Sequence, residues 1–151
     1  MTADSPFFKS DLQTEVRLAY EGCVMKSYRA SRSPCPIGRA ARVLGDRWVI
    51  MILREAFLGA DRFEQFVERM GINRAALTSR LEILQEAGLI RREPPEGKRA
   101  RYLLTPAGEA LVPLYKEMAD WGAQHLFDEG EPRGQWPQDA LAQSALSQGA
   151  D

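Results

Sequence analysis

The chain has 151 residues, of which 44% are hydrophobic and 27% are charged, and its formal net charge is −1. This length and composition are typical of one globular domain with an ordinary buried core. They exclude a uniformly basic nucleic-acid binder, and two cysteines are too few for a disulfide scaffold. The N-terminal sequence is polar and acidic, and no apolar run reaches about 18 residues, so we expect a cytoplasmic protein without a membrane span.

The inventory of reactive side chains argues against an enzyme. His125 is the only histidine, and Cys23 and Cys35 are too far apart for a zinc finger. No glycine-rich phosphate loop, dinucleotide-binding motif or GxSxG element is present. The sequence therefore predicts no catalytic residues, no metal and no cofactor.

Charge is distributed unevenly along the chain. Residues 36–104 hold thirteen basic and nine acidic side chains, whereas residues 105–151 hold two basic and eight acidic ones. The middle segment is the candidate surface for a polyanion, although an ordinary solvated surface would have the same composition.

The first predicted elements are helices. Ser10 and Gln13 have capping-box spacing and predict a helix to about Tyr28 within an N-terminal arm over residues 1–34. Pro36 suits the first position of a second helix, which Gly45 ends. The following helix, over residues 47–58 with Asp46 as its cap, is apolar nearly all round and is the predicted buried centre of the fold.

A short helix, a glycine turn and a longer helix come next. Asp61 and Glu64 form a capping-box pattern at the start of the short helix, and Gly71 ends it. Asn73 can cap the longer helix over residues 73–87. An apolar stripe places one face of that helix in the core, formed by Leu77, Leu81, Leu84 and Ala87. This order is typical of a helix-turn-helix.

The hydrophobic period then changes from 3.6 to 2. This pattern predicts two strands, over residues 89–93 and 99–104, joined by a turn rich in proline and glycine over residues 94–98. A helix-turn-helix followed by a hairpin with a basic tip predicts a winged helix-turn-helix, mainly α with a small β-hairpin wing, over residues 35–105.

Thr105 and Pro106 predict the start of one long helix to about residue 127, which Pro113 could bend. Its apolar stripe lacks a partner in the predicted domain and is a candidate dimer interface, formed by Leu111, Leu114, Met118 and Trp121. Residues 128–151 have no periodic apolar face, so we expect a largely disordered tail.

The longer helix and the hairpin supply candidate contacts to double-stranded DNA. The helix face opposite its apolar stripe has small and polar side chains suited to base edges in a major groove, namely Asn73, Arg74, Ala75, Thr78 and Ser79. Candidate phosphate contacts are Arg62, Arg80, Lys98, Arg99 and Arg101. Two alternatives stay open, an ordinary polar surface and a winged-helix module that binds protein instead of DNA.

Residues 35–126 resemble the HxlR-type family of MarR-related bacterial transcription regulators. The resemblance depends on Cys35-Pro36, Gly45 with Trp48, Leu53-Arg54-Glu55, Gly59, Arg62-Phe63, Leu77 with Arg80-Leu81, Leu84, Gly88-Leu89, Tyr102, Leu104-Thr105, Gly108 and Trp121-Gly122. It implies a homodimer that represses or activates at pseudo-palindromic sites, with the N-terminal helix and the C-terminal helix (106–127) at the dimer contact.

Cys35 has two interpretations. In several members of the family that it resembles, a cysteine here senses oxidants or electrophiles, and a helix N-terminus with Arg39 nearby would lower its pKa. The other interpretation is a small residue packed at the dimer interface. The family's two-cysteine switch is not implied, because no second cysteine follows Cys35. A DNA-modifying cysteine enzyme is a weaker alternative, since no histidine lies near Cys35 in the sequence. Neither the operator, the target genes nor a small-molecule or oxidant effector can be read from the residues.

Overall fold

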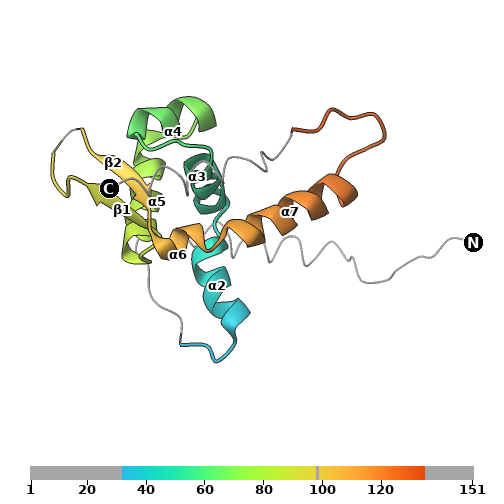
Figure 1. Cartoon of the computed structure of the whole chain (residues 1–151), viewed down its shortest axis with the longest axis horizontal. Helices are drawn as coiled ribbons and strands as arrows, with labels where there is room; N and C mark the ends of the chain where they lie inside the picture. The colour runs from blue at the N-terminus through green and yellow to red at the C-terminus, as the bar shows by residue number, and fades with distance from the viewer. Residues whose placement is uncertain (1–31, 98, 135–151) are drawn as a thin grey trace, which may run out of the picture.

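The computed structural model describes residues 32–97 and 99–134. Its elements are α2 (Pro36–Leu44), α3 (Arg47–Phe57), α4 (Phe63–Met70), α5 (Arg74–Glu86), β1 (Ile90–Glu93), β2 (Arg101–Leu104), α6 (Pro106–Glu109) and α7 (Val112–His125). This order confirms the predicted winged helix-turn-helix (Figure 1). The helix predicted from Ser10 lies outside the described residues, as do Cys23 and Lys98.

Helix α3 is the centre of the core, as predicted from its apolar run. Asp46 caps it, since the carboxylate Oδ1 accepts hydrogen bonds from the N–H groups of Trp48, at 2.8 Å, and Val49, at 3.2 Å. Val49, Ile52 and Leu53 of α3 are fully buried. Burial of each such side chain contributes about 1.5–3 kcal/mol to the stability of the fold.

Helix α4 begins differently from the prediction. Asp61 and Glu64 do not form the expected capping box. The side-chain oxygen of Gln65 instead accepts hydrogen bonds from the N–H groups of Asp61, at 2.9 Å, and Arg62, at 3.0 Å. The acidic side chains are drawn away because each lies beside an arginine from another element. Gly71 ends α4 in the left-handed conformation, with φ of +60°, which glycine adopts without steric cost.

Helix α5 confirms the predicted cap and the three leucines of the predicted stripe, whereas Ala87 follows the helix as its C-cap and is only half-buried. The side-chain oxygen of Asn73 accepts hydrogen bonds from the N–H groups of Ala75 and Ala76. The core side chains of α5 include one residue outside the predicted stripe, Ile83, and are Leu77, Leu81, Ile83 and Leu84.

The wing is a two-stranded antiparallel hairpin whose register pairs Ile90 with Leu104 and Glu93 with Arg101. The alternation expected of a strand is seen at its ends, where Ala100 and Leu104 are buried while Arg101 is exposed, but Tyr102 and Leu103 between them are both half-buried. The second strand starts at Arg101, two residues later than predicted. There the backbone N–H of Tyr102 donates to the carbonyl of Asp61 at 2.7 Å, which attaches the wing to the start of α4.

The single C-terminal helix predicted over residues 106–127 is wrong, because the segment forms two helices. Helix α6 ends at Glu109, and α7 begins at Val112. Pro113 has no N–H to donate to the carbonyl four residues earlier, and its ring would clash with that carbonyl, which favours a break in the helix here. Thr105 caps α6 as predicted, accepting from the N–H of Gly108 at 3.1 Å.

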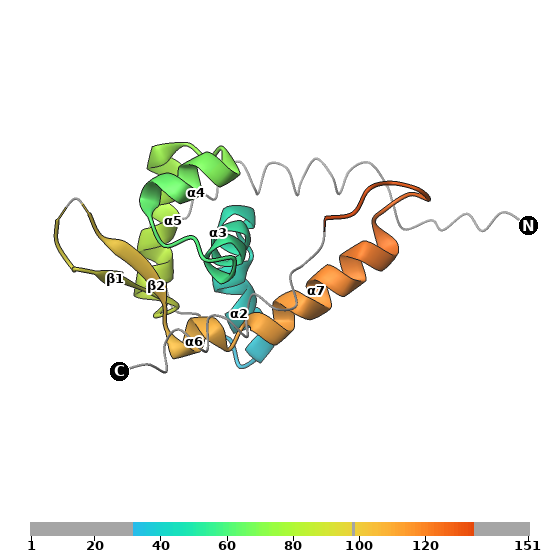
Figure 2. The ribbon, with the colours of Figure 1, turned by 45° about the horizontal axis from the view of Figure 1, so that its top comes forward.

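Helix α7 extends away from the helix-turn-helix and the wing in both views (Figure 2). Beyond it, residues 128–134 contain no helix or strand, and the remainder of the predicted tail lies outside the described residues. Within the described part of the chain, no helix is long and apolar enough to span a membrane.

Candidate DNA-binding surface

The side of α5 opposite the core is exposed and polar. Arg74, Ala75, Thr78 and Glu82 are exposed, whereas Ser79 is half-buried. The Thr78 hydroxyl donates to the carbonyl of Arg74 at 3.0 Å, so its proton is already used within the helix. The structure thus brings most of the predicted base-reading side chains to one open face.

Asn73 is at the start of this face but already has a structural role. Its side-chain oxygen caps α5 at 2.8 Å and 3.2 Å from two backbone N–H groups. A bidentate contact to adenine needs both the oxygen and the amide NH₂. While the cap is intact, only the NH₂ group remains for a base.

Arg74 is held across the turn by α4. Its guanidinium forms a bidentate ion pair with Glu64, at 2.9 Å from Nη1 to Oε1 and 2.5 Å from Nη2 to Oε2. The same guanidinium lies 5.5 Å from the centre of the Phe63 ring, within the range of a cation–π interaction. The structure therefore gives the first side chain of α5 a defined position.

Arg101 and Arg62 connect the wing to the start of α4. Arg101 pairs with Asp61, at 2.7 Å from Nε and 2.5 Å from Nη2 to the same carboxylate oxygen. The Arg62 side chain donates to the carbonyl of Arg99 at 3.1 Å. The backbone N–H of Arg62 donates to the side-chain oxygen of Gln65 at 3.0 Å, so only the Arg62 side chain is left for the predicted phosphate contact.

Arg80 lies away from the open face of α5. Its Nε and Nη2 atoms are 3.3 Å and 3.1 Å from Oδ2 of Asp46, and the two side chains are only 16% and 18% exposed. The pair fastens α5 to the N-terminus of α3. A phosphate contact by Arg80 would have to break it.

Arg92, for which the sequence predicts no role, holds the turn at the tip of the wing. Arg92 donates to the carbonyls of Pro95 and Gly97, the latter at 2.5 Å, and so braces the turn from inside. Arg99 is exposed beside this turn. Nothing in the sequence distinguishes Arg92 from its neighbour Arg91.

Glu55 is a buried acid that sequence reasoning also missed. It is 5% exposed, and its carboxylate pairs with Arg54 on the same helix and lies 3.7 Å from Nη1 of Arg69 on α4. A buried carboxylate without such partners would be strongly destabilising. This group therefore joins α3 to α4.

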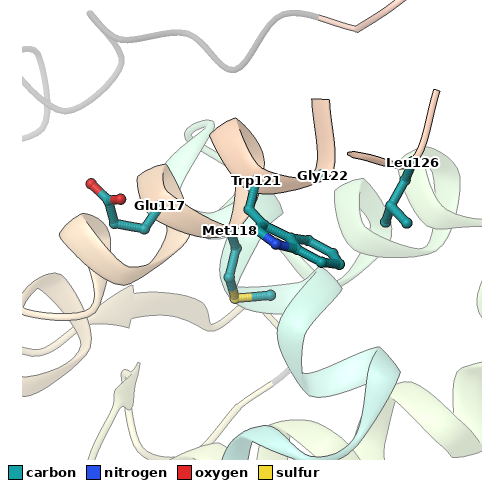
Figure 3. A pocket seen from close by; sticks show the side chains of 5 residues that line it. All are labelled: Glu117, Met118, Trp121, Gly122 and Leu126. Carbon is teal, nitrogen blue, oxygen red and sulfur yellow. The ribbon is translucent and has the colours of Figure 1, made fainter. Parts of the chain in front are cut away.

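The predicted dimer stripe separates into two parts. Leu111 is half-buried and packs against the domain's own core. Leu114, Met118 and Trp121 are 43%, 42% and 57% exposed. Met118 and Trp121 border a shallow groove of about 370 Å³ with Glu117, Gly122 and Leu126, and project from the same side of α7 (Figure 3).

Tyr115 attaches α7 to the core and was not predicted to do so. Its ring meets Phe57 edge-on at 4.9 Å, and its hydroxyl donates to the carbonyl of Ile50 at 3.0 Å. Burial raises the pKa of Tyr115, so the hydroxyl stays protonated as a donor.

Cys35 is exposed immediately before α2, and its N–H donates to the Ser33 hydroxyl at 3.2 Å. The Nε atom of Arg39, expected to support a thiolate, donates to the Ser33 carbonyl at 2.6 Å.

Comparisons with known proteins agree with this fold. A family model described as HxlR-like helix-turn-helix matches residues 43–129. An uncharacterized HTH-type transcriptional regulator of Mycobacterium tuberculosis, Rv3095, is 38% identical over 117 residues, covering 76% of this chain and 71% of that protein. The crystal structure of PA1607, a candidate transcription factor, has a TM-score of 0.65 and 34% identity over 69% of this chain and 74% of that one.

The transcriptional regulator YodB of Bacillus subtilis is also similar in structure. Its reduced form has a TM-score of 0.54 and 31% identity over 66% of this chain and all of that one. Its quinone-bound form has a TM-score of 0.53 and 30% identity over 60% of this chain and 99% of that one. These relatives are named as regulators and not as enzymes. Since the family model covers more than half of the sequence, the chain belongs to the HxlR-like helix-turn-helix family.

Proposed function

We propose that the chain is a transcription regulator that binds specific double-stranded DNA, with α5 in the major groove and the wing along the backbone. The observation that supports this most directly is the two-sided character of α5. Leu77, Leu81 and Leu84 are buried, while the opposite side is open and polar and begins with Arg74. Side-chain contacts with α4 join this face to the wing arginines, so the three elements form one continuous surface.

The contacts divide into two kinds. Arg74, Ala75, Thr78 and Ser79 are proposed to meet base edges, together with the amide NH₂ of Asn73. The proposed phosphate contacts lie on α4 and the wing, at Arg62, Lys98, Arg99 and Arg101. For Arg80 the phosphate contact is proposed only as an exchange, in which the phosphate replaces Asp46.

We further propose that two copies bind one pseudo-palindromic operator. The support is the exposed apolar side of α7, where Leu114, Met118 and Trp121 lie away from the core. Recognition helices of such a dimer would lie about 34 Å apart, which is one turn of duplex. A symmetric pairing of the α7 faces would also cover the groove beside Trp121.

Cys35 is the proposed site of regulation by an electrophile. It is exposed in a segment that leads directly into α2, and the similar regulator YodB has a quinone-bound form. An adduct at Cys35 would add bulk beside Ser33 and the start of α2. A coupling of about 1–3 kcal/mol would change operator occupancy about 5–150-fold.

The decisive experiment is selection of duplexes from a random DNA library by the purified full chain, followed by titration of the enriched sequence. Arg74→Ala should relax base preference at one position and cost about 1–3 kcal/mol. Arg99→Ala should weaken all sequences alike and reduce the slope of log K against log salt by about one unit. The control is Lys116→Ala on α7, which should change neither quantity.

Two results would refute the proposal. One is a selection that enriches no sequence. The other is operator binding by Arg74→Ala and Arg99→Ala that equals binding by Lys116→Ala.

A further inference from the structure

Two of the arginines proposed to meet DNA are each held by a carboxylate from the start of α4. Glu64 holds Arg74 of α5 through both carboxylate oxygens, at 2.9 Å and 2.5 Å. Asp61 holds Arg101 of the wing through two guanidinium nitrogens, at 2.7 Å and 2.5 Å. The acids and their partners are ten and forty residues apart in sequence, so the fold itself brings them together.

Stability does not explain the pair of Arg74 with Glu64 well, because the two side chains are 64% and 60% exposed. Exposed ion pairs contribute little to folding because water and salt screen them. The pair of Arg101 with Asp61 differs, since Asp61 is only 24% exposed and also lies 3.8 Å from Nε of Arg62. A carboxylate on a surface that meets phosphates opposes binding through repulsion. The presence of exposed Glu64 beside Arg74 therefore calls for a role in DNA binding itself.

The geometry leaves each guanidinium partly available. A guanidinium has five N–H donors. Glu64 engages the two terminal nitrogens of Arg74, which leaves the Nε–H and one N–H on each terminal nitrogen. Arg74 can therefore donate to a base edge from its present position without leaving Glu64. To reach a phosphate elsewhere along the groove, it must give up the pair.

We propose that Glu64 determines specificity by keeping Arg74 from the phosphates of unrelated DNA. This inference rests on the proposed function and adds to it a role for an acidic residue. Non-specific complexes obtain nearly all their affinity from phosphate contacts and counterion release. Such complexes lose a contact when Glu64 holds Arg74. The operator complex loses less, because Arg74 keeps three N–H donors for a base edge while the pair is intact. Arg101 is proposed to contact phosphate in both kinds of complex, so its pair with Asp61 does not distinguish them.

The variants Glu64→Gln and Asp61→Asn remove one charge each and keep the side-chain shape. Glu68→Gln is the matched control, since Glu68 is exposed on the same helix and has no ion-pair partner within residues 32–97 and 99–134. The probes are a labelled random-sequence duplex of about 24 base pairs, long enough for two half-sites, and the duplex enriched by the wild-type chain. Affinity is measured by fluorescence anisotropy at several salt concentrations, and thermal unfolding is measured for every variant.

Glu64→Gln should bind the random duplex about two- to fivefold more tightly, the range expected when one exposed ion pair is removed. Its affinity for the enriched duplex should change less, so the specificity ratio falls. Asp61→Asn should change both affinities alike, because Arg101 is proposed to contact phosphate in both complexes. For Glu64→Gln, the slope against salt on the random duplex should steepen by up to about one unit, because one more arginine reaches phosphate. In an Arg74→Met background, Glu64→Gln should have no further effect on the ratio.

Equal shifts for Glu64→Gln and Glu68→Gln would overturn the inference, because a general charge effect would then suffice. An effect of Glu64→Gln that persists in the Arg74→Met background would overturn it as well. A loss of affinity for both duplexes together with a lower melting temperature would also overturn it, because the ion pairs would then act by stabilising the fold. If the wild-type chain binds neither duplex, the proposed function is wrong and this inference falls with it.

Discussion

Trp121 offers the strongest test of the proposed dimer. A tryptophan buries at most about 150–250 Å², and this one is 57% exposed in the isolated chain. Covering that fraction removes roughly 85–140 Å² from water, equivalent to about 2–3.5 kcal/mol at ~25 cal/mol per Å². In a symmetric dimer the residue occurs twice. Trp121→Ala should therefore cost about 4–7 kcal/mol, which weakens dimerisation by about 10³–10⁵-fold.

Sedimentation equilibrium over a wide concentration range measures this change directly. The control is Lys116→Ala, whose side chain is on α7, is 48% exposed and pairs with Asp120. An exposed pair of this kind contributes under about 1 kcal/mol, so this control should dimerise as the wild type does. A wild-type chain that is monomeric at micromolar concentration would refute the reasoning. So would a Trp121→Ala chain that dimerises as tightly as Lys116→Ala.

Three further predictions concern single residues. Asn73→Asp should keep the cap of α5 and the melting temperature of the protein but lose operator affinity, whereas Asn73→Ala should also lose about 1 kcal/mol of stability. Equal operator affinity in the wild type and Asn73→Asp would exclude a base contact by the amide. Gly108→Ala should destabilise the fold by about 1–3 kcal/mol or more in urea denaturation, because the new Cβ would lie 2.2 Å from the carbonyl oxygen of Leu89. An unchanged urea midpoint would show that the backbone moves to make room for the Cβ. A quinone should alter operator affinity in the wild type and in Cys23→Ser but not in Cys35→Ser, and an identical response in all three would leave Cys35 as a packing residue.

Elements with a strong local period could be predicted from the sequence. The apolar run of α3, the Leu77 and Leu81 stripe of α5 and the alternation of Ala100 with Arg101 each reflect contacts that repeat along one element. The fold class followed from their order. The break before α7 was harder to predict, because Pro113 is equally compatible with a bend inside one helix and with the first turn of a new helix.

The state of the site residues depends on contacts that no local pattern contains. Asp46 and Arg80 are thirty-four residues apart, and Asp61 and Arg101 are forty apart, so their pairing follows only from the packed fold. The spacing of Asp61 and Glu64 suggested a capping box, which does not form. Such a pattern predicts helix capping only where the side chains have no better partner, and here each pairs with an arginine. The arginines chosen for DNA were identified by type and position, whereas the acids that hold them were not.

Helix α3 connects the two surfaces on which the proposed function depends. Asp46 at its N-terminus holds Arg80 of α5, and the carbonyl of Ile50 one turn later accepts the hydrogen bond from Tyr115 of α7. The Tyr115 ring also packs against Phe57 near the other end of α3. Helices α5 and α7 are therefore both attached to α3, α5 at its N-terminus and α7 between Ile50 and Phe57. In a dimer joined through α7, the separation of the two α5 helices would be set by how each α7 lies on its own α3. Operator spacing is then a property of this packing as much as of the dimer contact itself.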